Sequence, residues 1–160
     1  MSAAESGAEW ELRYIEPGTP EYAQAAELRY EMLYAHLGLP RSLIEDSDGR
    51  RYVHIAAFED ERVVGYARIH LEGGDSQVYQ VCVGEDRRGL GMASALMREL
   101  ASLAVRKGRT EISLHARTHA IGFYEKLGFA AEGEEFLSPR TGTPHRVMRR
   151  PLAVDDVRLG

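Results

Sequence analysis

The chain has 160 residues, 44% of them hydrophobic and 28% charged, which is the balance of a single globular domain. Its net charge of −5 argues against a nucleic-acid-binding protein, which usually carries a basic surface. The one cysteine, Cys82, excludes an internal disulfide and a cysteine-based zinc cluster. No apolar run approaches the roughly 18 residues that cross a membrane. Residues 1–10 lack the basic and apolar regions of a secretory signal, so we expect a cytoplasmic protein with neither nucleic-acid nor membrane partners.

The first half of the chain predicts an antiparallel meander after one long helix. Residues 1–9 are expected to be disordered, and Trp10–Ile15 to form a first strand. A helix over Glu21–Leu37 follows from the helical spacing of its apolar residues, with a proline in its first turn and Gly38 after its end. The polar residues 41–51 predict a turn or short helix and a loop. Three strands joined by short turns are then expected at Tyr52–Phe58, Arg62–Leu71 and Gln77–Val83.

The second half predicts alternating helices and strands. The amphipathic stretch Met92–Lys107 predicts a long helix with one apolar stripe, and Ala120–Leu127 a shorter one that a glycine ends. Strands are expected at Thr110–His115, Glu132–Leu137 and Arg146–Arg150. The result is an α/β fold with a mixed, mostly antiparallel central sheet of six to seven strands flanked by helices. We expect one domain over residues 10–152 and a tail over residues 153–160.

The loop Gly84–Gly91, between the third meander strand and the long helix, carries the strongest functional signal. A glycine-rich loop that opens a helix offers unpaired N–H groups and the positive end of the helix dipole to an anion. A nucleotide-binding P-loop would need a lysine and a hydroxyl residue where Met92 and Ala93 stand. A dinucleotide site would match the run Gly89–Ser94, with Glu111 further on, but that motif belongs after the first strand of a parallel βαβ unit. Three meander strands precede it here, so both nucleotide readings are disfavoured.

Two separate blocks match a known family in the correct order. Arg88-Gly89-Leu90-Gly91-Met92-Ala93 fits the pattern [Gln/Arg]-x-x-Gly-x-[Gly/Ala] after a valine-rich strand. The run Ala120–Phe129 fits Ala-x-x-Phe-Tyr-x-x-x-Gly-Phe, one helix and one strand later. The chain therefore resembles the GCN5-related N-acetyltransferase (GNAT) family from Trp10 to Leu152. Within that family it looks most like the bacterial ElaA/YjcF-like subgroup, through Glu27-Leu28-Arg29, the acidic cluster Glu45–Asp48 and the stretch His115–Met148.

The resemblance implies acetyl-CoA as co-substrate and no metal. The amides from Arg88 to Ala93 would hold the pyrophosphate, and the pantetheine arm would lie beside the strand edge. The Val83 N–H would polarise the thioester carbonyl. The cofactor-binding residues expected on this basis are Val81, Cys82, Val83, Arg87, Arg88, Gly89, Leu90, Gly91, Met92, Ala93, Ser94, His119 and Phe123. His119 stands where relatives commonly carry asparagine, so its contact with the pantetheine is open.

The resemblance also implies N-acetyl transfer from acetyl-CoA to a primary amine by direct attack. Tyr124 would be the general acid that protonates the departing thiolate, since a phenol is protonated at neutral pH. The alternative for Tyr124 is a structural core residue. The alternatives for the whole protein are a non-catalytic acyl-CoA sensor and a transferase that uses another acyl-CoA. The acceptor is expected to be a small-molecule or peptide amine, and the oligomeric state is open, a homodimer included.

Several other residues carry weaker signals. Cys82 could carry an acyl group, but a cysteine in an apolar strand is more often inert. His115 and His119 do not share one helix face, so no metal site is expected. The general base could be His54, His145, Glu45 or Glu134, and the spacing does not select one. The acidic run Glu45–Asp48 is either a solvated loop or an anionic mouth for a cationic amine.

Overall fold

A seven-stranded sheet with the order β1-β2-β3-β4-β5-β7-β6 is the centre of the fold. The computed structural model describes residues 9–44 and 49–157. Neighbouring strands are antiparallel except for the parallel pair β4 and β5, so the expected mixed, mostly antiparallel sheet is confirmed. The strands are β1 (Glu11–Ile15), β2 (Tyr52–Glu59), β3 (Arg62–His70), β4 (Gln77–Val83), β5 (Glu111–Arg117), β6 (Ala130–Leu137) and β7 (Pro144–Pro151).

Within the described residues, three α-helices flank the sheet: α2 (Pro20–Arg29), α3 (Met92–Arg106) and α4 (Ile121–Lys126). The helix expected over residues 21–37 is interrupted, because α2 gives way to a π-helical turn over Tyr30–Tyr34 and then to a 3₁₀ turn over Ala35–Leu37. A wide π turn shifts the side chains that follow it around the helix axis, and such turns often lie at functional sites. No helix of the described chain is long and apolar enough to cross a membrane.

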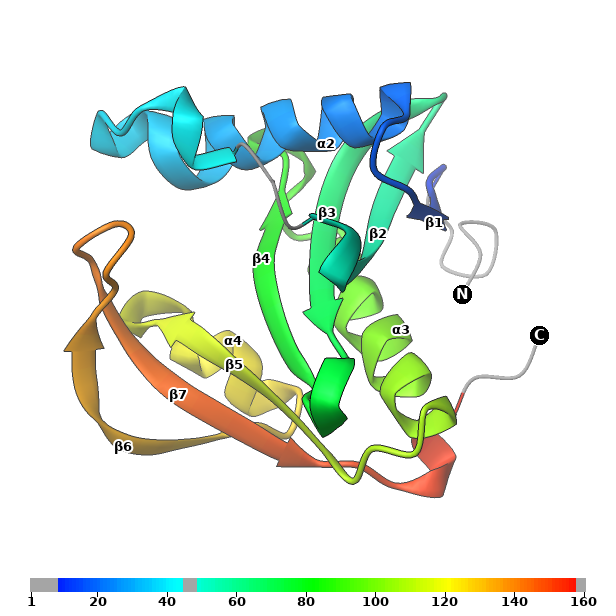
Figure 1. Ribbon diagram of the computed structural model, residues 1–160, viewed down its shortest axis with the longest axis vertical. Helices are drawn as coiled ribbons and strands as arrows, with labels where there is room; N and C mark the ends of the chain where they lie inside the picture. The colour runs from blue at the N-terminus through cyan, green and yellow to red at the C-terminus, as the bar shows by residue number, and fades with distance from the viewer. Residues whose placement is uncertain (1–8, 45–48, 158–160) are drawn as a thin grey trace.

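Helix α2 lies on one face of the sheet, and α3 and α4 lie on the other (Figure 1). Successive strand residues point to opposite faces. Ile55 accordingly packs in a core with Leu96 and Leu100 of α3, while its neighbour Ala56 packs in a second core with Ala25 of α2. Tyr124 of α4 belongs to the first core, so α3 and α4 cover the same face.

The strands β4 and β5 diverge from a short paired segment (Figure 1). They pair only at Gln77 with Ser113 and at Val78 with Leu114. Beyond that point the edge of β4 that faces β5 has no strand partner in the described chain, and its polar backbone groups are open to another extended molecule.

A β-bulge in β4 coincides with the divergence. Between the pairs Arg68–Tyr79 and Tyr66–Cys82, the register advances by two residues on β3 and by three on β4, so β4 carries one extra residue. Gln80 lies within this bulge in a left-handed conformation, with φ of 55°. Such a conformation costs a residue with a side chain about 1–2 kcal/mol, so other contacts must hold it.

Those contacts come from the helical segment that precedes β2. Arg29 Nη1 donates a hydrogen bond of 2.9 Å to Gln80 Oε1, and Gln80 Nε2 donates one of 3.1 Å to the Tyr34 hydroxyl. Arg29 is fully buried, with its guanidinium 5.0 Å from the ring centroid of Tyr66. The bulge is therefore fixed by side chains of α2 and the π turn.

The chain's C-terminal part is also anchored. Residues 153–160 were expected to form a tail, but Val154–Asp156 form a 3₁₀ turn that packs near α3. Arg150 Nη2 donates a hydrogen bond of 2.5 Å to Asp156 Oδ1, and Asp156 Oδ2 accepts one of 2.7 Å from the Ala153 N–H. Burial alone would raise the pKa of Asp156, but these two donors hold it below its ordinary value.

Candidate active site

The N-terminus of α3 presents unpaired amides at the end of the glycine loop. Gly89 and Gly91 have φ of 80° and 78°, a conformation that residues with a side chain rarely adopt. The first helical hydrogen bond runs from the Ala95 N–H to the Gly91 carbonyl at 3.0 Å. The amides of residues 92–94 precede it and have no helical acceptor, and no side chain caps them. The first turn also carries no acidic residue, so it can accept an anion.

The two arginines of the loop have different environments. The Arg87 guanidinium is paired with Glu59 at the end of β2 and with Asp86 at 3.0 Å, so it holds the loop against the sheet. Arg88 is exposed and makes no ion pair within the described chain. The sequence suggested the same role for both, but Arg88 is the cation that remains available at the rim of the loop.

The open edge of β4 presents the Val83 amide. Gly84 N–H donates to the Val64 carbonyl of β3 at 2.8 Å. Successive N–H groups of a strand point to opposite edges, so the Val83 N–H points away from β3, towards the divergence from β5. By the same alternation, the Cys82 N–H points to β3, as the Gly84 N–H does. Val83, at the end of β4, is thus the better placed of the two for the expected contact.

Cys82 is buried, and burial raises the pKa of its thiol to about 12. A thiol with this pKa is almost entirely protonated at neutral pH, and the thiolate is the nucleophilic form. These properties favour the inert core role over an acyl-carrying one.

A cavity of about 470 Å³ lies between the diverging strands. Its walls come from residues 77–81 of β4, residues 114–117 of β5, the end of the π turn, and the connection between β6 and β7. Tyr124 and His119 also line it. The cavity therefore brings together residues from Leu33 to His145, more than 100 positions apart in the sequence, and its size is that of a small-molecule site.

Tyr124 joins the buried core to this cavity. Its ring makes edge-to-face contacts with Phe123 and Phe129, at centroid distances of 5.0 Å and 5.9 Å. Within the described chain its hydroxyl has no hydrogen-bond partner, which leaves it available to a bound molecule. Burial raises the pKa of Tyr124 to about 12, while the positive charge of Arg117 opposes the rise. Phe123 supports the Tyr124 ring and packs against the core, while His119 is exposed in a 3₁₀ turn.

The four candidate general bases differ in burial, in hydrogen bonding and in access to the cavity. His54 is 1% exposed, and both its ring nitrogens are engaged, with the Tyr66 hydroxyl at 2.6 Å and the Gly49 carbonyl at 2.7 Å. Glu134 is exposed on β6 and does not line the cavity, and Glu45 lies outside the described residues, as does the whole acidic run 45–48. His145 does line the cavity.

The hydrogen bonding of His145 defines its tautomer. Its Nδ1 lies 2.9 Å from the Thr143 carbonyl, which can only accept, so Nδ1 carries the proton. The other nitrogen, Nε2, then has a lone pair in the neutral ring and makes no hydrogen bond within the described chain. The ring is also held by stacking on Phe136 at 6.1 Å between centroids. The His145 ring is therefore held in one orientation, with Nε2 left without a hydrogen-bond partner in the described chain.

Metal ligation has no support among the described residues. No group of three or more histidine, cysteine, aspartate or glutamate side chains in residues 9–44 and 49–157 could hold an ion. His115 lies on β5 and His119 on the turn after it, and both line the cavity with no carboxylate beside them among its described walls.

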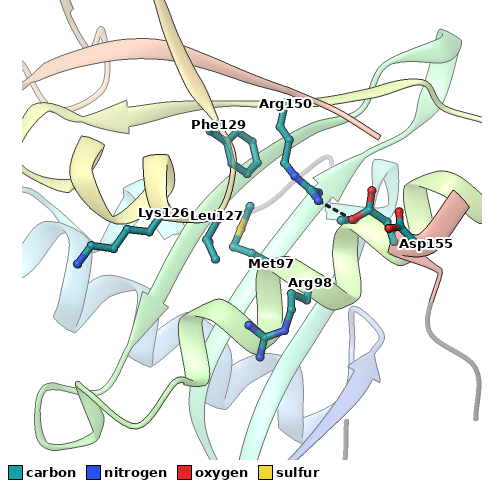
Figure 2. Close-up of a pocket in the computed structure, with 9 residues that line it drawn as sticks. Met97, Arg98, Lys126, Leu127, Phe129, Arg150 and Asp155 are labelled. Carbon is teal, nitrogen blue, oxygen red and sulfur yellow. Dashed lines mark hydrogen bonds and ion pairs between the residues drawn. The ribbon is translucent and has the colours of Figure 1, made fainter. Parts of the chain in front are cut away.

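A second hollow of about 290 Å³ lies between α3, the end of α4 and the C-terminal turn (Figure 2). Arg98 and Lys126 lie on one side of it, and the Arg150–Asp156 ion pair, with Asp155 nearby, on the other. The floor is apolar, with Met97, Leu127 and Phe129. Because positive and negative side chains both line this hollow, it favours no particular ligand. The hollow lies where the Arg150–Asp156 ion pair anchors the C-terminal turn.

The comparisons with known proteins agree on one family. Residues 9–129 match the acetyltransferase (GNAT) family. A Bacillus subtilis (strain 168) protein named as an acetyltransferase is 32% identical over 97 residues, which are 61% of this chain and 65% of that protein. The uncharacterized N-acetyltransferase YjcF of the same strain is 32% identical over 98 residues, 61% of this chain and 69% of YjcF. The chain thus spans about two thirds of the length of these relatives.

Solved structures share the fold at lower identity. An acyl-CoA N-acyltransferase from Pseudomonas aeruginosa superimposes with a TM-score of 0.73 at 24% identity, covering 88% of this chain and 97% of that one. Escherichia coli ElaA gives 0.73 at 23% identity, with 89% and 99% covered. A GNAT family acetyltransferase from Elizabethkingia anophelis with acetyl-CoA bound gives 0.69 at 14% identity, with 90% and 99% covered.

Proposed function

The chain belongs to the acetyltransferase (GNAT) family, and on that premise we propose that it transfers an acetyl group from acetyl-CoA to the primary amine of a small molecule or peptide by direct attack. One observation carries the proposal. The open edge of β4 leads from a loop of unpaired amides to a cavity that contains both an available phenol and an available imidazole. A donor lying along β4 would bring its thioester to that cavity.

The donor side uses backbone groups. The amides of residues 92–94 would bind the pyrophosphate of acetyl-CoA, and Arg88 would add charge at its rim. The pantetheine arm is amide-like, so it can pair with the open edge of β4 as an added strand. The Val83 N–H would donate to the thioester oxygen, on which negative charge develops during attack. A relative in fold from Elizabethkingia anophelis has acetyl-CoA bound, which supports this donor.

The acceptor side uses two side chains of the cavity. A free amine is largely protonated in water and must lose a proton to attack. His145 Nε2 would take that proton, because Nδ1 already donates to Thr143. The nitrogen forms a bond to the acetyl carbon and the carbon–sulfur bond breaks. Tyr124 would act on the acid side of the reaction, by donating its hydroxyl proton towards the departing sulfur.

The activity is tested by coenzyme A release. The protein is mixed with acetyl-CoA and a panel of amines, and free thiol is measured. Release that depends on an amine supports the transferase. Binding of coenzyme A without thiol release from any amine would support the sensor instead, and a concentration of coenzyme A one hundred times its Kd would then stabilise the fold by about 2.7 kcal/mol.

The base is tested with a matched pair of histidine variants. His145→Gln removes the proton acceptor from the cavity, while His36→Gln changes an exposed histidine of a 3₁₀ turn. We expect His145→Gln to lower kcat about 10²–10⁴-fold, as removal of a general base does. His36→Gln should leave kcat unchanged. Equal kcat values in the two variants would exclude His145.

A further inference from the structure

The charge of the cavity is one-sided. Three arginines line it: Arg68, Arg117 and Arg140. Three histidines line it as well, together with tyrosine, glutamine, serine and threonine side chains. Among its described walls there is no aspartate or glutamate. A site for a polyamine or another purely cationic acceptor would be expected to show the opposite balance.

Arg117 and Arg140 reach the cavity from separate elements. Arg117 ends β5, and Arg140 lies in the connection between β6 and β7. Arg117 Nη2 donates to the Leu33 carbonyl at 3.3 Å, and Arg140 Nη2 donates to the Leu43 carbonyl. Neither makes an ion pair with a residue of the described chain. Arg68 is engaged with Tyr66 and Tyr52, and the inference does not depend on it.

This pairing differs from that of several other arginines in the same protein. Arg13, Arg87, Arg149 and Arg150 each form an ion pair with at least one carboxylate of the described chain. A guanidinium has five N–H donors, and one bond to a carbonyl leaves most of them for a ligand. The Arg140 guanidinium also lies over the Tyr34 ring, 5.9 Å from its centroid, a contact that uses the face of the guanidinium and not its N–H donors. Two guanidinium groups that face one cavity without a carboxylate partner in the described chain form a site for an oxyanion.

We propose that the acceptor is an amine that also carries a carboxylate, such as an amino acid, and that Arg117 and Arg140 bind this carboxylate. The inference rests on the proposed transferase activity and names its class of acceptor. A carboxylate matches the planar fork of a guanidinium and can accept two parallel hydrogen bonds. The arginines thereby orient the acceptor by its acidic end.

The same positive charge helps the chemistry at the amine. A nearby cation disfavours the protonated form of an amine and lowers its pKa. An amine held in this cavity would pass its proton to His145 more readily than the same amine in water. The carboxylate of the acceptor would balance part of the positive charge of Arg117 and Arg140, which an amine cannot do.

The test compares amines that differ only in the carboxylate. The pairs are phenylalanine with phenethylamine, tyrosine with tyramine, and lysine with cadaverine, and coenzyme A release is followed for each. We expect kcat/KM to be at least tenfold higher for the carboxylated member. Arg140→Gln and Arg117→Gln should each reduce that ratio at least fivefold, and Arg140→Lys should reduce it less. Arg62→Gln, an exposed arginine at the start of β3, is the matched control and should leave the ratio unchanged.

The results separate this inference from the proposed function. Equal or better turnover of the decarboxylated amines would overturn the inference and leave the transferase standing. An equal loss for both members of a pair in Arg140→Gln and Arg117→Gln would also overturn it, because the arginines would then only support the loops. If no amine releases coenzyme A, the transferase is overturned, and the pairs are compared by melting temperature with coenzyme A present. A larger rise for the carboxylated members would support the carboxylate site, and equal shifts would overturn it.

Discussion

Replacing Tyr124 by phenylalanine removes one hydroxyl group and leaves the aromatic packing in place. The ring contacts with Phe123 and Phe129 do not involve the hydroxyl, which has no hydrogen-bond partner within the described chain. We therefore expect little change in the free energy of unfolding. The effect should fall on the chemical step.

The pKa of Tyr124 sets the size of that effect. Burial raises it to about 12, whereas an ordinary thiol has a pKa of about 8.5. Complete proton transfer from Tyr124 to the thiolate is thus uphill by about 3.5 pKa units, or about 5 kcal/mol. The hydroxyl is better suited to stabilise the departing thiolate by a hydrogen bond. Such a bond to a charged group contributes about 1.5–3 kcal/mol, so we expect kcat to fall about 10- to 150-fold in Tyr124→Phe.

The assay is coenzyme A release at saturating acetyl-CoA, with the Kd of coenzyme A measured beside it. Tyr14→Phe is the control, because the Tyr14 hydroxyl donates to Glu99 at 2.6 Å and Tyr14 lies on the edge strand β1, away from the cavity between β4 and β5. The profile of kcat against pH should show no loss from Tyr124 ionisation below about pH 11, since the hydroxyl stays protonated there. An unchanged kcat in Tyr124→Phe would leave Tyr124 as a core residue. A large rise in the Kd of coenzyme A would refute the separation of binding from catalysis.

Three further changes test other parts of the structure. Arg88→Gln should raise the KM for acetyl-CoA about two- to fivefold at unchanged kcat, which is the contribution of one exposed charge. Arg87→Gln should mainly lower the melting temperature, because it removes the ion pair with Glu59, and the reverse pattern would contradict the assignment. Cys82 should resist alkylation at pH 8. Because burial raises its pKa to about 12, stability should fall as the pH rises from about 9 to 12, and urea titrations of Cys82→Ala should show a shallower fall. Asp156→Asn should lower the free energy of unfolding by about 1–3 kcal/mol at pH 7, measured as a lower melting temperature. The difference in stability between the two proteins should shrink as the pH falls through the lowered pKa of Asp156. The KM for acetyl-CoA should stay unchanged.

The strand, loop and helix that we propose to bind the donor could be predicted as structural elements because they are local in the sequence. The loop has a left-handed backbone at Gly89 and Gly91. Glycine adopts this conformation readily, so the two glycines can be recognised in the sequence itself. The strand, loop and helix follow one another within about 30 residues, so their order in the chain is also their order in space. The resemblance to the GNAT family is confirmed, and the family's second motif correctly placed Tyr124 on the following helix.

The acceptor side could not be predicted because its parts are distant in the chain. Tyr34, Arg117 and Arg140 meet only through the pairing of the sheet and the path of its connections. The register between β5 and β7, which places Arg117 opposite His145, cannot be read from the sequence. The helix expected over residues 21–37 is interrupted by a π turn, and the last residue of that turn, Tyr34, accepts a hydrogen bond from Gln80 of β4, a contact that the local sequence does not reveal.

Gln80 connects the two sides. Its left-handed backbone produces the bulge beyond which β4 leaves β5, and its side chain is held by Arg29 and by Tyr34, which lines the acceptor cavity. The edge of β4 that we propose for the donor therefore depends on the same residue that shapes the wall of the cavity proposed for the acceptor. A substitution that removes only the side chain, such as Gln80→Ala, should disturb both sites together. A change in the KM of the acceptor without a change in the KM of acetyl-CoA would show that β4 keeps its divergence without these contacts, and that the bulge is fixed by the backbone of the sheet alone.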